Sequence, residues 1–174
     1  MTKSLLVLGG ARSGKSAYAE SRAAAHAGDK IYIATAEVTD AEMGERIRHH
    51  QDRRGKGWLT VEAPLDLSAA LRELDAPNRV ILIDCVTVWI NNLIFHDRAV
   101  EPAVADFCAA LSQAEGKIIM VSNEVGFGIV PENVLARRFR DLAGRANQSI
   151  AATADEVVLV VAGLPLTMKR SAPE

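Results

Sequence analysis

The sequence predicts an α/β doubly wound domain, with a mainly parallel sheet and helices on both of its faces. Short apolar runs that barely alternate recur along the chain, which is typical of strands buried on both faces. Amphipathic stretches of helical length lie between these runs, and such alternation of strand and helix favours a doubly wound sheet. No repeat or linker divides the 174 residues, so we expect a single domain over residues 1–174.

The apolar runs give five expected strands, and a sixth short segment is a candidate for an edge strand. The five runs are Ser4–Leu8, Lys30–Ala34, Arg79–Asp84, Lys117–Ser122 and Glu156–Val161, and the edge candidate is Trp58–Glu62. The expected helices between them are Lys15–His26, Asp40–Gln51, Leu67–Leu74, Val86–Phe95, Ala103–Ala114 and Glu132–Ala154.

The last expected helix carries an apolar stripe and a basic face. The stripe repeats at spacings of three and four and comprises Leu135, Phe139, Leu142, Ala146 and Ile150, and Pro131 suits the first turn. The arginines that fall largely off the stripe are Arg137, Arg138, Arg140 and Arg145. We interpret them as a solvated face on which Asp141 supports Arg145. The alternative is an anion-binding face beside the active site or at a subunit contact.

Composition and charge argue against several classes of protein. The net charge of −2 disfavours broad coating of nucleic acid or an anionic membrane surface as the main role. Two cysteines, Cys85 and Cys108, cannot build a disulfide framework, and we expect packed thiols in a cytoplasmic protein. The first apolar run is too short for a membrane span or a secretory signal.

Residues 9–16 match the phosphate-binding pattern G-x-x-x-x-G-K-[ST]. The matching residues are Gly9, Gly10, Ala11, Arg12, Ser13, Gly14, Lys15 and Ser16, between an apolar strand and an amphipathic helix, as the motif requires. Glycines let successive N–H groups point at a phosphate, and the helix amino terminus favours negative charge. Lys15 can reach the β- and γ-phosphates, and the Ser16 hydroxyl can ligate Mg²⁺. The pattern therefore predicts a P-loop NTPase domain, of the RecA-like type, that binds a nucleoside triphosphate.

A P-loop usually works with an acid at the end of another buried strand. Asp84 ends the run Arg79–Asp84, on the edge of an open α/β sheet where ligands collect. We expect Asp84 to hold Mg²⁺, directly or through water. The alternative is a cap for the helix that follows.

Two adjacent histidines lie in the expected helix Asp40–Gln51. The helical pattern places His50 with the apolar Met43 and Ile47, and His49 on the charged side. Adjacent histidines diverge and no third ligand is evident, so the signal for a metal site is poor. A neutral imidazole can attack phosphorus, but the spacing alone does not favour a nucleophile over a solvated side chain.

Several further motifs follow the P-loop in order, over nearly the whole chain from Leu6 to about Gly163. They are Ala19-Glu20, Tyr32–Thr35 (YIAT), Glu42–His49 (EMGERIRH), Trp58–Glu62 (WLTVE), Asn123–Asn133 (NEVGFGIVPEN) and Gly144–Gln148 (GRANQ). With the opening GGARSGKS, this set resembles the bifunctional adenosylcobinamide kinase / adenosylcobinamide-phosphate guanylyltransferase family of cobalamin biosynthesis.

The resemblance implies two reactions on one protein. The first phosphorylates the aminopropanol hydroxyl of adenosylcobinamide with ATP or GTP. The second transfers GMP from GTP to that phosphate and gives adenosyl-GDP-cobinamide and pyrophosphate. The family carries GMP on the first histidine of the Glu42–His49 motif, which is His49 here, while His50 would support or pack.

The resemblance also implies nucleotide contacts beyond the P-loop, and a homo-oligomer, a trimer. The matching positions are Ala34, Thr35, Ala36, His50, Gln51, Asp52, Arg53, Glu62 and Asp84. The segment Asn123–Gly128 has two interpretations: its glycines make a turn, or its polar groups face the corrinoid or a neighbouring subunit. Phe127 and Trp89 are core or interface residues in either case.

Two other functions compete with this reading of the sequence. One is a simple P-loop kinase for another small metabolite, with His49 inert. The other is a nucleotide-switched binding or motor module, supported only by the arginines of the last helix and disfavoured by the near-neutral charge.

Overall fold

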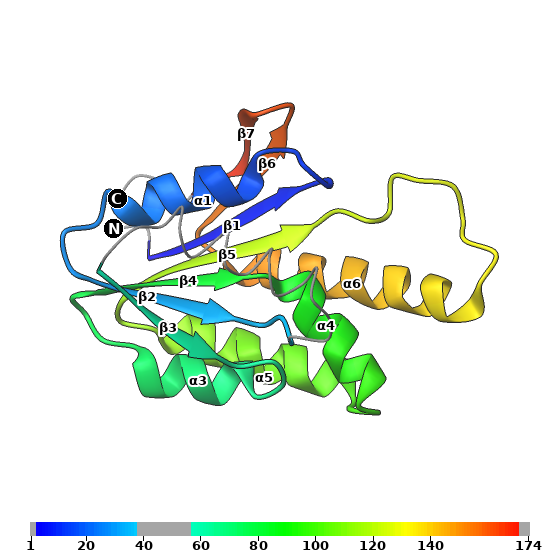
Figure 1. Cartoon of the computed structure of the whole chain (residues 1–174), viewed down its shortest axis with the longest axis horizontal. Helices are drawn as coiled ribbons and strands as arrows, with labels where there is room; N and C mark the ends of the chain where they lie inside the picture. The colour runs from blue at the N-terminus through cyan, green and yellow to red at the C-terminus, as the bar shows by residue number, and fades with distance from the viewer. Residues whose placement is uncertain (1–2, 38–56, 171–174) are drawn as a thin grey trace.

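A computed structural model describes residues 3–37 and 57–170 and centres on one seven-stranded sheet (Figure 1). Its strands are β1 (Ser4–Gly9), β2 (Asp29–Ala34), β3 (Trp58–Glu62), β4 (Arg79–Asp84), β5 (Lys117–Asn123), β6 (Glu156–Val161) and β7 (Leu164–Lys169). They lie in the order β3-β2-β4-β5-β1-β6-β7. Every neighbouring pair is parallel except β6 with β7. The expected mainly parallel sheet is confirmed, with β3 at one edge.

Helices cover both faces of this sheet, as expected. They are α1 (Lys15–Ala24), α3 (Leu67–Leu74), α4 (Val86–Phe95), α5 (Val100–Gln113) and α6 (Val134–Thr153). Figure 1 shows α1 on one face and the other four on the opposite face. The expected helix Asp40–Gln51 lies outside the described residues. No helix in the described ranges is long and apolar enough to cross a membrane.

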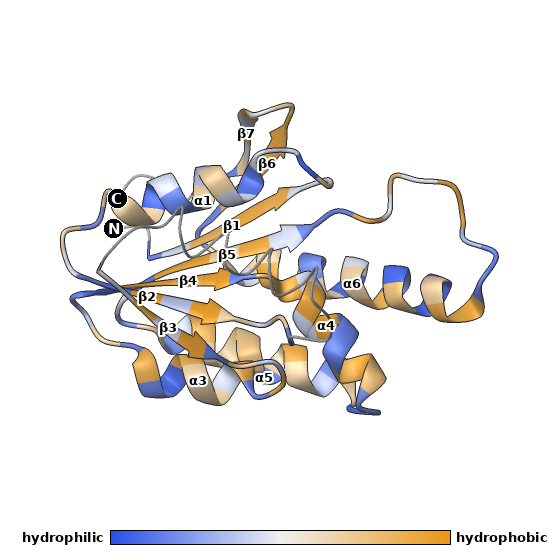
Figure 2. Cartoon of the chain, viewed as in Figure 1, coloured by the Kyte–Doolittle hydropathy of each residue, from blue (hydrophilic) through white to orange (hydrophobic). Residues whose placement is uncertain are grey.

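Alternate strand residues supply two apolar cores, one on each face. On the α1 side, Leu5 and Val7 pack with Ala19 of the helix, whereas Leu6 faces the other four helices. The inner strands β1, β4 and β5 are therefore mainly apolar, as Figure 2 shows, because both faces of the sheet are buried there. Each buried aliphatic side chain contributes about 1.5–3 kcal/mol to folding. Trp89 belongs to the core on the side of the other four helices, with its ring centroid 5.6 Å from that of Phe107.

One strand and the starts of two helices differ from the expectation. Strand β7 is absent from the expected strands. Helix α5 begins at Val100 rather than Ala103, because Pro102 fits the first turn of a helix. Helix α6 begins at Val134 after Asn133, whose side chain accepts a hydrogen bond of 3.1 Å from the backbone N–H of Ala136. Pro131 therefore precedes this helix, and its expected place in the first turn is wrong.

The apolar stripe of α6 is buried over only part of its length. Leu142 and Ile150 are buried, while Leu135 is 47% exposed. The first turns of α6 extend beyond the tips of the strands (Figure 1), so no layer of the sheet covers them. The expected support of Arg145 by Asp141 is also wrong. Arg145 pairs with Glu101 at 3.5 Å, and Asp141 lies 3.2 Å from Arg140.

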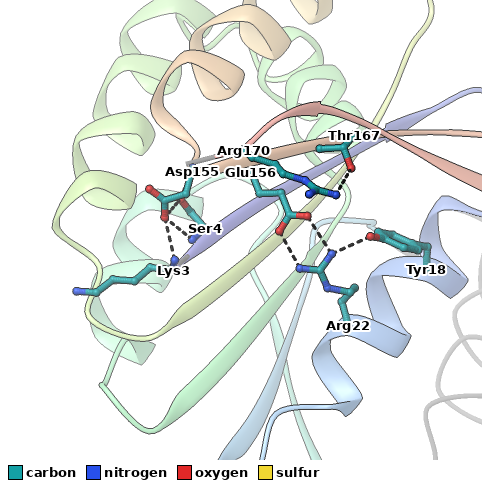
Figure 3. Close-up of polar contacts among 8 residues, drawn as sticks. All are labelled: Lys3, Ser4, Tyr18, Arg22, Asp155, Glu156, Thr167 and Arg170. Atoms are coloured by element: carbon teal, nitrogen blue, oxygen red, sulfur yellow. Dashed lines mark hydrogen bonds and ion pairs between the residues drawn. The ribbon is translucent and has the colours of Figure 1, made fainter. Parts of the chain in front are cut away.

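Charged groups fasten α1 to the amino end of the sheet (Figure 3). The Arg22 guanidinium donates to both carboxylate oxygens of Glu156, at 3.1 and 2.8 Å, and to the Tyr18 hydroxyl at 2.7 Å. The Asp155 carboxylate accepts from the backbone N–H groups of Lys3 and Ser4, both at 2.9 Å. These contacts fix β1 and α1 relative to β6, and with them the ends of the loop that joins β1 to α1.

Candidate nucleotide-binding site

The loop between β1 and α1 borders a cavity of about 930 Å³ at the carboxyl end of the sheet. Residues 11–17 line it from the loop and the first turn of α1, and residues 123–125 line it from the end of β5. The predicted P-loop is thus at a cavity, and it leads directly into a helix amino terminus, where an anion is stabilised.

Close packing explains the glycines of the loop. A side chain on Gly9 would collide with the Ser13 hydroxyl and lie 2.7 Å from the carbonyl oxygen of Val160 on β6. Gly14 has a φ of 96°, in the left-handed region that favours glycine, and it precedes the first residue of α1. The loop can therefore bend into the helix and remain close to β6.

The turn between β6 and β7 supports the loop from outside. The N–H of Gly163 donates to the carbonyl oxygen of Ser13 at 2.8 Å. A side chain on Gly14 would lie 3.2 Å from the Cα of Gly163. The hairpin that the sequence analysis missed therefore helps to hold the phosphate-binding loop in place.

Lys15 is buried in the loop and faces a neutral partner. Its ammonium group donates to the carbonyl oxygen of Gly10 at 3.0 Å, and the residue is 9% exposed. Burial lowers the pKa of Lys15, while the negative charge of Asp84 acts in the opposite direction. Asp84 is thus near enough to interact electrostatically with Lys15. A buried ammonium group next to a carbonyl oxygen is poised to receive an anion such as a phosphate.

The parallel register brings the predicted strand-end residues to one edge of the sheet. Asp84 is the register partner of Ala34, and Ala34 is in turn the partner of Glu62. On the other side of β4, strand β5 places Asn123 beside Gly9. The acid strand β4 and the P-loop strand β1 are therefore separated by β5, and their carboxyl ends face the same side.

Two protein groups near the P-loop fit a magnesium ion. Ser16 lines the cavity, and the Asp84 carboxylate is near enough to interact electrostatically with Lys15. Within the described ranges, no three His, Cys, Asp or Glu side chains gather as a metal site. Magnesium at a nucleotide is held by one or two protein groups together with phosphate oxygens and water, so this small donor set is sufficient.

The side chain of Thr35 is engaged in the fold. It is fully buried, and its hydroxyl donates to the carbonyl oxygen of Cys85 at 2.8 Å and accepts from the Cys85 N–H at 2.9 Å. Asn92 donates to the carbonyl oxygen of Thr35 at 2.7 Å. Thr35 thus joins the ends of β2 and β4, and its hydroxyl is engaged within the fold as both donor and acceptor.

The two cysteines behave as packed thiols. Both are free, and Cys85 is buried. Burial raises the pKa of the Cys85 thiol to about 12, so it is protonated and unreactive at neutral pH. The expectation of packed rather than reactive cysteines is confirmed for Cys85.

Five of the predicted site residues lie outside the described residues, so the structure does not place them. They are His49, His50, Gln51, Asp52 and Arg53. Their roles remain predictions.

Sequence reasoning missed the connection between Glu124 and Asn147. Glu124 lines the cavity, and its carboxylate accepts from the Asn147 side chain at 2.9 Å. Both residues belong to motifs of the sequence, but their separation of 23 positions hides the contact.

Comparison with known proteins agrees with this geometry. The family model for cobinamide kinase / cobinamide phosphate guanyltransferase matches residues 5–168. The bifunctional adenosylcobalamin biosynthesis protein CobU of Salmonella typhimurium is 43% identical in an alignment of 180 positions that covers 95% of this chain and 99% of that protein. The bifunctional adenosylcobalamin biosynthesis protein CobP of Pseudomonas aeruginosa is 46% identical in an alignment of 170 positions that covers 94% of this chain and 96% of that one.

The fold also resembles solved structures of low sequence identity. Flagellar accessory protein FlaH from Methanocaldococcus jannaschii superposes with a TM-score of 0.55 and 16% identity, over 97% of this chain and 79% of that chain. This likeness concerns the fold alone and agrees with an α/β P-loop domain of the RecA-like type. Since the family model spans nearly the whole sequence and both relatives match end to end, the chain belongs to the cobinamide kinase / cobinamide phosphate guanyltransferase family.

Proposed function

We propose that this protein is a single-domain, bifunctional enzyme of cobalamin biosynthesis. It phosphorylates the aminopropanol hydroxyl of adenosylcobinamide with ATP or GTP. It then transfers GMP from GTP to the new phosphate and releases pyrophosphate. Membership of the family and the names of the two relatives support both activities.

The buried Lys15 in its phosphate-binding loop is the observation that carries this proposal. Its ammonium group is held by Gly10 at 3.0 Å, beside the cavity that Ser16 also lines. Positive charge fixed at this point stabilises the charge that develops on transferred and departing phosphates in either reaction. Ser16 and Asp84 would hold Mg²⁺, which when bound neutralises phosphate charge.

His49 is the proposed nucleophile of the second reaction, on the strength of the motif Glu42–His49. One imidazole nitrogen forms a bond to the α-phosphorus of GTP while the bond to the bridging oxygen breaks, and pyrophosphate leaves. The phosphate of the corrinoid substrate then attacks the GMP–imidazole bond and frees the histidine.

The remaining nucleotide contacts are proposed from the same family motifs. They comprise Gly9–Ser16, the strand-end residues Ala34, Thr35, Ala36, Glu62 and Asp84, and residues His50, Gln51, Asp52 and Arg53. Among them, Thr35 is fully buried, with its hydroxyl bonded to Cys85.

We also propose that the protein works as a cytoplasmic homo-oligomer, a trimer as in the family. The segment between β5 and α6 carries Phe127, Ile129 and Val130, which are 83%, 95% and 58% exposed. On β7, Leu164 and Met168 are also exposed. Such a concentration of exposed apolar side chains supports a protein contact.

The test is incubation with Mg²⁺ and GTP labelled on the α-phosphate, followed by denaturation and a search for label on the protein. We expect a covalent label that is acid-labile and base-stable, as a phosphoramidate is. The label should disappear in His49→Ala and persist in the control His26→Ala, a histidine beyond the end of α1 that has no role in the proposed site.

The competing functions give different results in the same experiment. Phosphorylation of a small alcohol without any labelled protein would favour a simple kinase. Hydrolysis of nucleotide stimulated by DNA, again without label, would favour a nucleotide-switched module.

A further inference from the structure

A carboxylate with no assigned role lies beside the P-loop, at the end of β5. The backbone N–H of Glu124 donates to the carbonyl oxygen of Gly9 at 3.1 Å, which ties the residue to the start of the loop. Glu124 lines the same cavity as Lys15 and Ser16. Its backbone position is therefore fixed relative to the groups that would hold the nucleotide phosphates.

The carboxylate of Glu124 is oriented by a buried amide. The Nδ2 of Asn147, on α6, donates to Glu124 Oε1 at 2.9 Å and to the carbonyl oxygen of Asn123 at 3.1 Å. Asn147 is only 5% exposed. A long, flexible side chain is thereby held in one orientation at the edge of the cavity.

The amide itself is held by hydroxyl groups from two further elements. Ser122 on β5 donates to Asn147 Oδ1 at 2.7 Å, and its hydroxyl lies 3.1 Å from that of Thr87 on α4. The backbone N–H of Asn123 donates to the Thr87 hydroxyl at 2.6 Å. With Oδ1 accepting from Ser122, Nδ2 must face Glu124. A fully bonded buried network of this kind is rigid, and it ends on a carboxylate at the cavity.

The partner of Glu124 is neutral, and this matters for its chemistry. In the described part of the chain the carboxylate is held by an amide rather than by a lysine or arginine. A cation would stabilise the ionised form and weaken the carboxylate as a base. An amide donor on one oxygen orients the group and leaves the second oxygen, Oε2, to accept a proton.

We infer that Glu124 is the general base of the kinase reaction and that Asn147 is its positioning residue. The inference rests on the proposed function, because the base acts on the alcohol of that substrate. The O–H bond of the alcohol breaks and its proton passes to Glu124. The alcohol oxygen bonds to the γ-phosphorus, the bond to the bridging oxygen breaks, and the nucleoside diphosphate leaves with that electron pair. Glu124 then returns the proton to water.

The second reaction supplies an internal control. Its acceptor is a phosphate that is already ionised at neutral pH, so attack on the GMP–imidazole bond requires no base. Loss of Glu124 should therefore affect one of the two reactions and spare the other.

The test compares Glu124→Gln, Glu124→Asp and the control Glu132→Gln, an exposed acid farther along the same segment. For Glu124→Gln we expect kcat of phosphorylation of adenosylcobinamide to fall by about 10²–10⁴, a usual range for a general base. KM for the nucleotide and GMP transfer to adenosylcobinamide phosphate should change less than about twofold, because neither depends on the base. Glu124→Asp should recover part of the rate, and Glu132→Gln should match the wild type.

Asn147→Ala tests the positioning residue. We expect a smaller fall in kinase kcat, about tenfold, with GMP transfer retained and the melting temperature recorded as a check on folding. The pH profile is the readout that a purely structural role would not change: the acidic limb of kinase kcat should shift in Asn147→Ala and vanish in Glu124→Gln.

Each outcome separates the inference from the proposed function. Full kinase activity in Glu124→Gln, or equal loss of both reactions, would overturn the role of Glu124 only. A wild-type protein that phosphorylates no adenosylcobinamide while forming the GMP adduct would overturn the kinase half of the proposed function.

Discussion

The charged groups at the two ends of the sheet have different kinds of partner. At the amino end, Arg22 meets Glu156 at 2.8 Å, and Asp155 accepts from backbone N–H groups (Figure 3). At the carboxyl end, Lys15 meets a carbonyl oxygen and Glu124 meets an amide. The hydroxyl of Ser13 is buried there with no hydrogen-bond partner among the described residues.

Because of this difference, we expect the charged groups at the amino end to serve stability and those at the carboxyl end to serve binding. Charges that are matched within the chain stabilise the folded state, and they have no capacity left for a ligand. Charges and donors that face neutral partners, or none, cost folding free energy and gain a partner only when an anion arrives. We therefore expect substitutions at the carboxyl end to affect activity, and substitutions at the amino end to affect stability.

The largest effect should come from Lys15→Met. Removing the buried ammonium group should lower kcat/KM of both reactions by about 10³ or more, since it stabilises phosphate charge in each. The free energy of unfolding should stay level or rise, because a desolvated charge has been removed. Activity assays with a urea titration of the same preparations would measure both.

Lys30→Met is the control, since Lys30 is a half-buried lysine that lies at the amino end of β2. Its activity should equal that of the wild type. A Lys15→Met protein that lost stability and kept activity would remove the contrast between the two ends.

Thr35→Val should have the next largest effect. Although Thr35 lies at the carboxyl end of the sheet, we expect this substitution to affect stability. The valine is nearly isosteric but leaves the carbonyl and the N–H of Cys85 without the hydroxyl that both now bond. We expect a loss of about 1–3 kcal/mol in the free energy of unfolding. Thr35→Ser, which keeps the hydroxyl, should lose less. If Thr35→Val instead raised KM for GTP at unchanged stability, its side chain would have to contact the nucleotide.

The sequence was most informative where structure is local or buried on both faces. Strands such as β4 are continuous apolar runs, because helices cover both faces, and their limits were predicted to within a residue or two. The P-loop was predictable because one short segment supplies the strand end, the turn and the helix start.

The missed features depend on contacts between distant segments. All residues of β7 except the last are exposed, and one of them is Pro165. The strand therefore lacks the continuous apolar run that marks a strand buried on both faces. Its signal is the pair Ala162 and Gly163, whose φ angles of 51° and 81° suit a tight hairpin. The contact of Glu124 with Asn147 crosses from a strand end to a helix, and no spacing rule predicts it.

The smallest expected effect is a pH dependence of stability at the amino end. Arg22 lowers the pKa of Glu156 by hydrogen bonding. Burial would raise the pKa of Asp155, but hydrogen bonds from Ser4 and Lys3 outweigh it, and the net shift is downward. Both acids therefore contribute stability above their unfolded pKa values of about 4, and this contribution is lost as the pH falls through the lower, folded values.

Because these groups are partly solvated, we expect the contribution to be about 1 kcal/mol or less. It should appear in urea titrations between about pH 2 and pH 7 as a fall in the free energy of unfolding that begins near pH 4. The double variant Asp155→Asn/Glu156→Gln should be less stable at pH 7 and should show a shallower fall, whereas Glu101→Gln, in an exposed pair with Arg145, should match the wild type. If the free energy of unfolding fell equally steeply with pH in the double variant and in the wild type, the matched charges would not stabilise the amino end. Lys15 would then differ from these charged groups in burial alone.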